Sequence, residues 1–234
     1  MAIGGGDFQS VIPTGATDKA THVAPFRLDR VPVTNGEFLD FVVHHPEWQR
    51  NRIAALFADH DYLSQWEGSK RLGTGVDPRQ PVTRVSWFAA RAYCEAAGRR
   101  LPTWSEWEFV AAADEDIPDA RRDAAWRERI LSWYGQPAGH VLSRVGTAAA
   151  NFYGVQDMHG LVWEWVEDFN ALLVSSDSRD QSDPDKLKFC GAGAISLADR
   201  DNFAVLMRVA FLSALSAKST ARSLGFRCAM DPAA

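Results

Sequence analysis

Cysteine chemistry is the first possibility that this sequence raises, because it contains Cys94, Cys190 and Cys228. Their odd number leaves at least one thiol without a partner inside the chain. No two of them have the C-x-x-C spacing, so spacing alone indicates no metal motif. A free cysteine is most often a small buried apolar side chain. A reactive or metal-binding thiol therefore needs further support from the sequence.

Carboxylates beside tryptophans are the second group that could do chemistry. Glu106 and Glu108 lie two residues apart in the segment WSEWEFV. A pair of carboxylates could serve as general acid and base, but that role requires a cleft, and nothing in the sequence indicates one. We therefore interpret both as structural acids.

The segment GLVWEW, residues 160–165, contains a third acidic side chain between two tryptophans. Its alternation is typical of a strand with two different faces. Buried tryptophans need hydrogen-bond partners for their indole N–H groups. We therefore expect this segment in or beside the core, with Glu164 held by hydrogen bonds.

The elements that must position these side chains begin with clear signals. Thr34 and Glu37 form one capping box and Thr103 and Glu106 another, each followed by a helical pattern. Ser86 is a plausible N-cap for a helix over 87–97, and a further amphipathic surface helix is expected within 119–135. The run 23–33 alternates as a half-buried strand does. These signals predict a mixture of helices and short strands.

The bulk composition sets limits on domain number and partners. The chain has 234 residues, 46% of them hydrophobic, with nine tryptophans, which suffices for a sizeable core. Its net charge of −5 is spread over interspersed acids and bases, so we expect no nucleic-acid partner. No apolar run approaches membrane-spanning length, so no membrane span is expected. Without repeats or linkers, residues 1–234 are expected to form one domain.

A specific combination of motifs resembles a known family. The combination consists of PFRLDRVPVTNGEFLDFV, GRRLPTWSEWEFVAAA, GLVWEW and SLGFRC, in this order. It resembles the formylglycine-generating enzyme (sulfatase-modifying factor) family, from about Phe8 to Cys228. The resemblance implies an α+β fold, the formylglycine-generating-enzyme fold, which is C-type-lectin-like. It also implies a single compact domain with sparse regular secondary structure.

The resemblance also shows where this chain departs from the family's activity. Family enzymes bind monovalent copper with two cysteines five residues apart and oxidise a substrate cysteine to formylglycine. Aligning KFCGAGAIS with that region puts the two positions at or near Ser196 and near Asp201. A hydroxyl and a carboxylate are poor ligands for monovalent copper. We therefore expect no formylglycine-generating activity.

A family calcium site is altered as well. Leu161 replaces the asparagine that helps to bind calcium in the family. Glu164 and backbone carbonyls remain as calcium ligands, and they would form only a weakened site.

The remaining predictions about the cysteines follow from the resemblance. Cys94 and Cys228 match positions that form a disulfide in exported members, so we expect them to be bonded. Cys190 is then the unpaired thiol, and the glycines that follow it permit a close backbone approach. It is the candidate catalytic residue. Cys190, with His159 and Met207, is also a candidate metal site, because Cys, His and Met ligands suit copper.

The family context leads to three alternative functions. The chain resembles divergent bacterial members, some of which accompany copper nitrite reductases. We therefore expect a non-enzymatic accessory or binding protein of the periplasm, active in copper or nitrite-reductase maturation and partnered by a periplasmic copper enzyme. An export signal is expected to precede this sequence in the native chain.

The alternative is a metal-dependent oxidase with a relocated site around Cys190. A lectin-like binding module is a third possibility. Related sulfoxide synthases use an iron site on an added helical domain that we do not find here, so that branch is not favoured.

Overall fold

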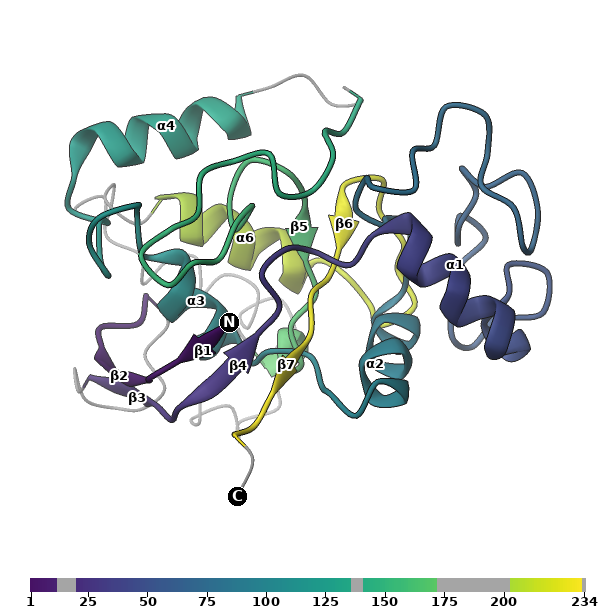
Figure 1. The fold of residues 1–234 in the computed structure, drawn as a ribbon, viewed down its shortest axis with the longest axis horizontal. Helices are drawn as coiled ribbons and strands as arrows, with labels where there is room; N and C mark the ends of the chain where they lie inside the picture. The colour runs from purple at the N-terminus through teal and green to yellow at the C-terminus, as the bar shows by residue number, and fades with distance from the viewer. Residues whose placement is uncertain (12–19, 136–140, 172–202, 233–234) are drawn as a thin grey trace, which may run out of the picture.

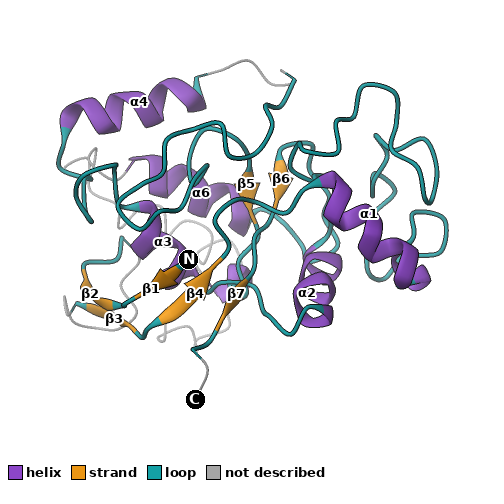
Figure 2. Ribbon diagram, viewed as in Figure 1, coloured by secondary structure: helices purple, strands orange, loops and turns teal. Residues whose placement is uncertain are grey.

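The computed structural model describes residues 1–11, 20–135, 141–171 and 203–232. Within these ranges, helices lie on either side of the short strands, with long loops between (Figures 1 and 2). The helices are α1 (Asn35–His44), α2 (Trp87–Ala96), α3 (Trp104–Ala111), α4 (Ala124–Tyr134) and α6 (Phe203–Ser213), with 3₁₀ turns at Pro46–Trp48 and Phe169–Ala171. The expected single compact α+β domain with few regular elements is confirmed.

The strands form three small sheets. The first is antiparallel with the order β1 (Ala2–Ile3), β4 (Phe26–Leu28), β7 (Ala229–Met230). The second pairs β2 (Gly6–Phe8) with β3 (Thr21–Val23), also antiparallel. The third pairs β5 (Trp163–Glu164) in parallel with β6 (Leu224–Gly225). The end of the described chain thus contributes to two of the three sheets.

The helix starts agree with their sequence signals. Thr34 accepts a hydrogen bond from the backbone N–H of Glu37, and the Glu37 carboxylate accepts one from the N–H of Thr34 at 2.8 Å. Thr103 and Glu106 form the same reciprocal box at the start of α3. These bonds satisfy N–H groups that a helix end otherwise leaves without partners.

One element differs from expectation. Within the alternating run 23–33, only β4 forms a strand after the last residue of β3, because the second half of the run leaves the sheet for the turn before α1. Among the described residues, no helix is long and apolar enough to cross a membrane.

The expected disulfide is present. Cys94 on α2 is bonded to Cys228, and both residues are fully buried. The bond joins positions separated by 134 residues and fixes α2 against the chain that leads into β7.

A buried ion pair lies at the centre of the core. Glu164 and Arg227 have no exposed side-chain surface. The Glu164 carboxylate accepts from Arg227 Nη2 at 2.8 Å, from Arg227 Nε at 2.9 Å and from the indole N–H of Trp107 at 2.8 Å. The remaining guanidinium N–H groups donate to backbone carbonyls of Asp29, Arg30 and Gln156. Every donor of Arg227 is therefore used, and Glu164 is held by hydrogen bonds as expected.

Removing the disulfide should destabilise the protein. The chain-entropy model gives a loss of about 5 kcal/mol in the free energy of unfolding for a loop of this length. Denaturant titration of the Cys94→Ser, Cys228→Ser double variant measures the loss. Reductant should weaken the wild type and leave the double variant unchanged; equal stability of the wild type with the bond intact and reduced would contradict the assignment.

Neutralising Glu164 should cost more than neutralising a comparable acid at the surface. Glu164→Gln leaves the Arg227 charge buried without a counter-charge, so we expect a loss of about 3–5 kcal/mol. Glu95→Gln is the matched control, because the side chains of Glu95 and its partner Arg91 are 56% and 45% exposed; a loss of about 0.5 kcal/mol is expected there. Urea unfolding compares the two variants. Equal losses would show that burial does not set the strength of the Glu164 pair.

Candidate functional site

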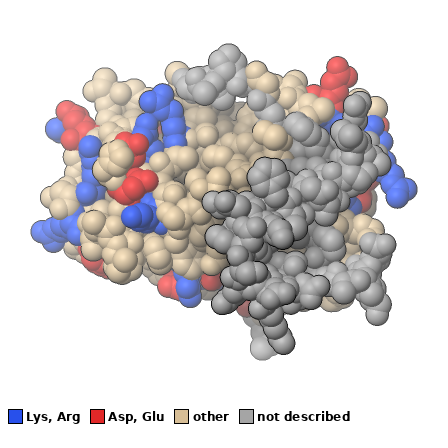
Figure 3. All heavy atoms as spheres, turned by 180° about the vertical axis from the view of Figure 1, so that it is seen from behind, with Lys and Arg blue, Asp and Glu red and all other residues tan. Residues whose placement is uncertain are grey.

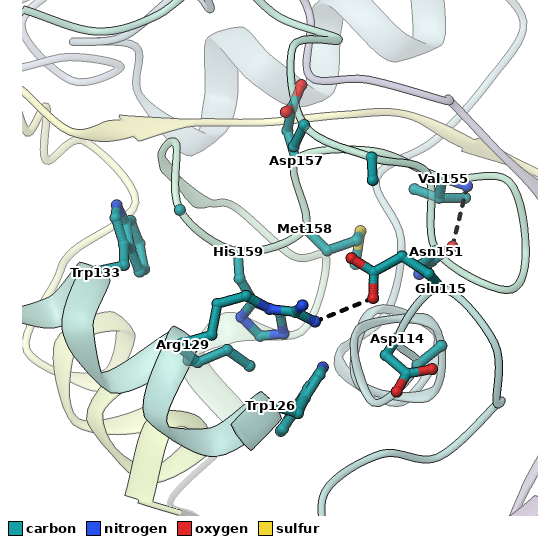
Figure 4. Close-up of a pocket in the computed structure, with 15 residues that line it drawn as sticks. Asp114, Glu115, Trp126, Arg129, Trp133, Asn151, Val155, Asp157, Met158 and His159 are labelled. Carbon is teal, nitrogen blue, oxygen red and sulfur yellow. Dashed lines mark hydrogen bonds and ion pairs between the residues drawn. The ribbon is translucent and has the colours of Figure 1, made fainter. Parts of the chain in front are cut away.

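A cavity of about 270 Å³ opens beside α4. We call it the α4 hollow (Figure 4). One wall is α4, and the facing wall is built from residues 113–115, which follow α3, and from the loop over 148–160. The side chains of α4 that line it are Trp126, Arg129, Ile130 and Trp133.

Helix α4 lies here because the side chains of its apolar face are buried in a small separate cluster. Asp123 caps the helix by accepting from the N–H of Trp126 at 2.7 Å. Trp126 and Ile130 are buried and pack with Ala120 in a small cluster separate from the main core. The sequence expectation of an amphipathic helix over the body of the protein therefore describes α4 correctly.

The facing loop is fixed by side chains that bond to the backbone. Asn151 donates to the carbonyl of Val110 at 2.9 Å and accepts from the N–H groups of Tyr153 and Val155. Asp157 has a φ of +59°, a conformation that aspartate tolerates better than most residues, and it accepts from the N–H of Gly146. Burial raises the pKa of Asp157. These bonds fix the backbone of the loop that faces α4 across the hollow.

His159 is the histidine that lines the hollow. Its Nε2 donates to the carbonyl of Ala111 at 2.8 Å, since that oxygen can only accept. The ring meets those of Trp107 and Trp126 edge-on, each at 5.6 Å. Burial lowers the pKa of His159 to about 4. The half-buried imidazole is thus neutral at pH 7, with Nδ1 as an acceptor.

Charged side chains occupy the rim. Glu115 accepts from Arg129 Nη2 at 3.2 Å, and Figure 4 shows this ion pair reaching across the hollow. Asp114 Oδ1 accepts from the backbone N–H groups of Asp116 and Ile117, and these bonds hold its pKa below the usual range. Elsewhere, acids and bases are interspersed on the described part of the face seen in Figure 3.

The acids singled out in the sequence have structural partners. Glu106 forms an ion pair with Arg100 at 2.7 Å. Glu108 accepts from the backbone N–H of Val11 and the indole of Trp104, and burial raises its pKa. These contacts agree with the interpretation of both as structural acids.

The calcium hypothesis does not fit the geometry around Glu164. Both carboxylate oxygens already accept from Arg227, and the positive charge beside them disfavours a cation. Leu161, which is buried, offers no side-chain oxygen. Glu164 is a counter-ion of the core, and the calcium expectation is corrected accordingly.

The copper hypothesis stays a prediction. Cys190 lies outside the described residues, as do Ser196 and Asp201. Met207 is on α6 with 40% of its surface exposed, whereas His159 lines the α4 hollow with Nε2 bonded to a carbonyl. Within the described ranges there is no group of three or more His, Cys, Asp or Glu side chains suited to a metal ion.

Sequence reasoning did not identify the α4 hollow. The spacing of Trp126, Ile130 and Trp133 indicated a buried helix face, but it did not indicate which loop would face that helix. Asp114 and Glu115 follow α3 in a stretch of ordinary polar composition, so no signal marked them.

Comparisons with curated proteins place the chain among relatives of different activities. It is 31% identical to the formylglycine-generating enzyme of Streptomyces coelicolor, over 88% of this chain and 78% of that protein. It is 30% identical to the inactive C-alpha-formylglycine-generating enzyme 2 of Mus musculus, over 88% and 75%. It is 36% identical to the hercynine oxygenase of Mycobacterium tuberculosis, over 62% of this chain but only 38% of that protein.

Solved structures support the same fold. The crystal structure of CarF covers 99% of this chain with a TM-score of 0.55 and 17% identity, and 97% of CarF is matched. PvdO from Pseudomonas aeruginosa covers 99% with a TM-score of 0.53 and 19% identity, and 93% of it is matched. The family model for the sulfatase-modifying factor enzyme 1-like domain matches residues 1–232. The family expectation is confirmed: this chain belongs to the sulfatase-modifying factor enzyme 1-like family.

Proposed function

We propose that this chain is a non-enzymatic binding protein of its family, and that the α4 hollow is its binding site. The observation that carries the proposal is that polar side chains below the rim fix the shape of the hollow. His159 bonds to the carbonyl of Ala111, and Asn151 bonds to backbone groups of Val110, Tyr153 and Val155. A preformed concave surface with apolar walls and a few placed polar groups is typical of ligand sites.

The donor chemistry also supports a function other than formylglycine generation. The residues aligned with the family's copper-binding cysteines, at or near Ser196 and near Asp201, supply oxygen donors instead of the soft thiolates that monovalent copper prefers. No step through copper is therefore assigned to these positions. The family contains a relative named as an inactive formylglycine-generating enzyme, so loss of that activity has a precedent within it.

For the cellular role, we propose export to the bacterial periplasm and service as an accessory to a copper enzyme, in copper or nitrite-reductase maturation. The Cys94–Cys228 disulfide supports export, because disulfides persist mainly in oxidising compartments. The copper enzyme as partner remains an inference from the motif resemblance.

The second candidate function is a metal-dependent oxidase with a site around Cys190. The similarity to a hercynine oxygenase favours it, because that relative is named for an oxygen-dependent activity. This chain spans 38% of that protein, so the similarity transfers no site by itself.

Binding at the α4 hollow can be tested by blocking it. Ala149→Trp places a large ring in the hollow at an exposed position, whereas Ala125→Trp adds the same ring to α4 away from it. We expect fragments of amino-acid size to shift the indole NMR signals of Trp126 and Trp133 in the wild type and in Ala125→Trp, but not in Ala149→Trp. Shifts that persist in Ala149→Trp, or that arise elsewhere, would contradict the assignment.

The absence of formylglycine generation can be tested by mass spectrometry. A cysteine-containing peptide from a sulfatase active-site segment, incubated with copper-loaded protein, should keep its mass, while the Streptomyces coelicolor enzyme should convert it. Conversion by this chain would refute the proposal.

Metal analysis separates the two candidate functions. After copper or iron loading and extensive dialysis, the binding-protein proposal expects no stoichiometric metal. One metal per chain that is lost in Cys190→Ser would favour the oxidase.

A further inference from the structure

The charges that line the α4 hollow are unbalanced. Asp114, Glu115 and Asp157 line the hollow together with Arg129. The Asp157 carboxylate is directed away from Arg129 (Figure 4) and accepts from the N–H of Gly146, so two carboxylates, those of Asp114 and Glu115, accompany the single guanidinium. Arg208 and Arg227 are the other nearby cations, but neither lines the hollow, and the guanidinium of Arg208 lies 3.5 Å from the ring centre of Trp107. The lining therefore carries an excess of negative charge.

The one guanidinium in the lining is weakly held. The side chains of Arg129 and Glu115 are 57% and 45% exposed, and ion pairs of such exposure contribute little to stability. Another cation can therefore take the place of Arg129 at Glu115 with little loss. Asp114 is a second fixed anion on the same rim, because its hydrogen bonds from backbone N–H groups favour the carboxylate form.

The walls below the rim are apolar and the space is small. Trp126, Ile130 and Met158 are buried side chains of the lining. Aliphatic groups pack against such walls, and aromatic rings attract cations. A volume of about 270 Å³ lies just below the range of roughly 300–1,000 Å³ that is usual for ligand pockets. The hollow thus suits a molecule of amino-acid size and is too small for a nucleotide.

We propose that the α4 hollow selects a small organic cation, an alkylguanidinium or alkylammonium compound. Its alkyl chain packs against Ile130 and Met158, and its cationic head replaces Arg129 as the partner of Glu115, beside Asp114. This inference rests on the proposed binding function and specifies the ligand class for the same site.

The test compares three probes of one size. Butylguanidinium is the cation, butylurea its neutral isostere and pentanoate an anion, each titrated against the full chain by NMR of the indole signals. We expect butylguanidinium to bind about five to ten times more tightly than butylurea, from one added charge interaction near the surface. Higher ionic strength should reduce this preference, since exposed charges are screened.

Two variants with opposite expected effects identify the charges responsible. Arg129→Gln removes the competing cation and should tighten butylguanidinium binding about fivefold, whereas Glu115→Gln should weaken it about fivefold. A folding defect cannot produce tighter binding, so the first variant guards against that explanation. Glu128→Gln is the matched control, because it removes an exposed charge from α4 that does not line the hollow; no change is expected.

The outcomes separate this inference from the function on which it rests. Equal affinities for butylguanidinium and butylurea, both lost in Ala149→Trp, would overturn cation selection and leave the binding site in place. Tighter binding of pentanoate would overturn it as well. No binding of any probe at the hollow would overturn both.

Discussion

The carboxylate of Glu164 and the guanidinium of Arg227 meet in the core without exposed surface, and the rest of the structure is arranged around this contact. Removing two charges from water costs several kcal/mol for each ion, and only close geometry with further hydrogen bonds offsets that cost. The further bonds come from Trp107 on α3 and from the backbone at Asp29, Arg30 and Gln156. One ion pair therefore sets the positions of chain segments from both ends and the middle of the sequence.

The α4 hollow depends on the same contact. Arg227 holds the carbonyl of Gln156, and the next three residues supply Asp157, Met158 and His159 to the lining. The backbone of Glu164 accepts from Arg208, whose guanidinium lies against Trp107, the ring that His159 meets edge-on. The residues that line the hollow are thus connected by direct contacts to the ion pair in the core.

Sequence reasoning succeeded where the signal was local or carried by a motif. Capping boxes involve residues three positions apart, so Thr34 and Thr103 could be assigned without tertiary information. The hydrogen-bonded burial of Glu164 followed from its position between two tryptophans, and the Cys94–Cys228 bond followed from the family motifs. The partner of Glu164 could not be derived, because Arg227 lies 63 residues away. For the same reason the hollow was missed: it forms only when α4 and a loop about twenty-five residues later face each other.

The disulfide and the ion pair also determine when this protein can fold. Arg227 and Cys228 are adjacent, and they leave the ribosome after nearly every other described element has been made. Until they emerge, Glu164 has no counter-charge and Cys94 has no partner, and the strand that pairs with β5 is made only just before them. The nascent chain therefore lacks these contacts between distant segments until residues 224–228 have been made. A chain stopped just before Arg227 would lack the buried ion pair and the disulfide, although most of its core residues would be present.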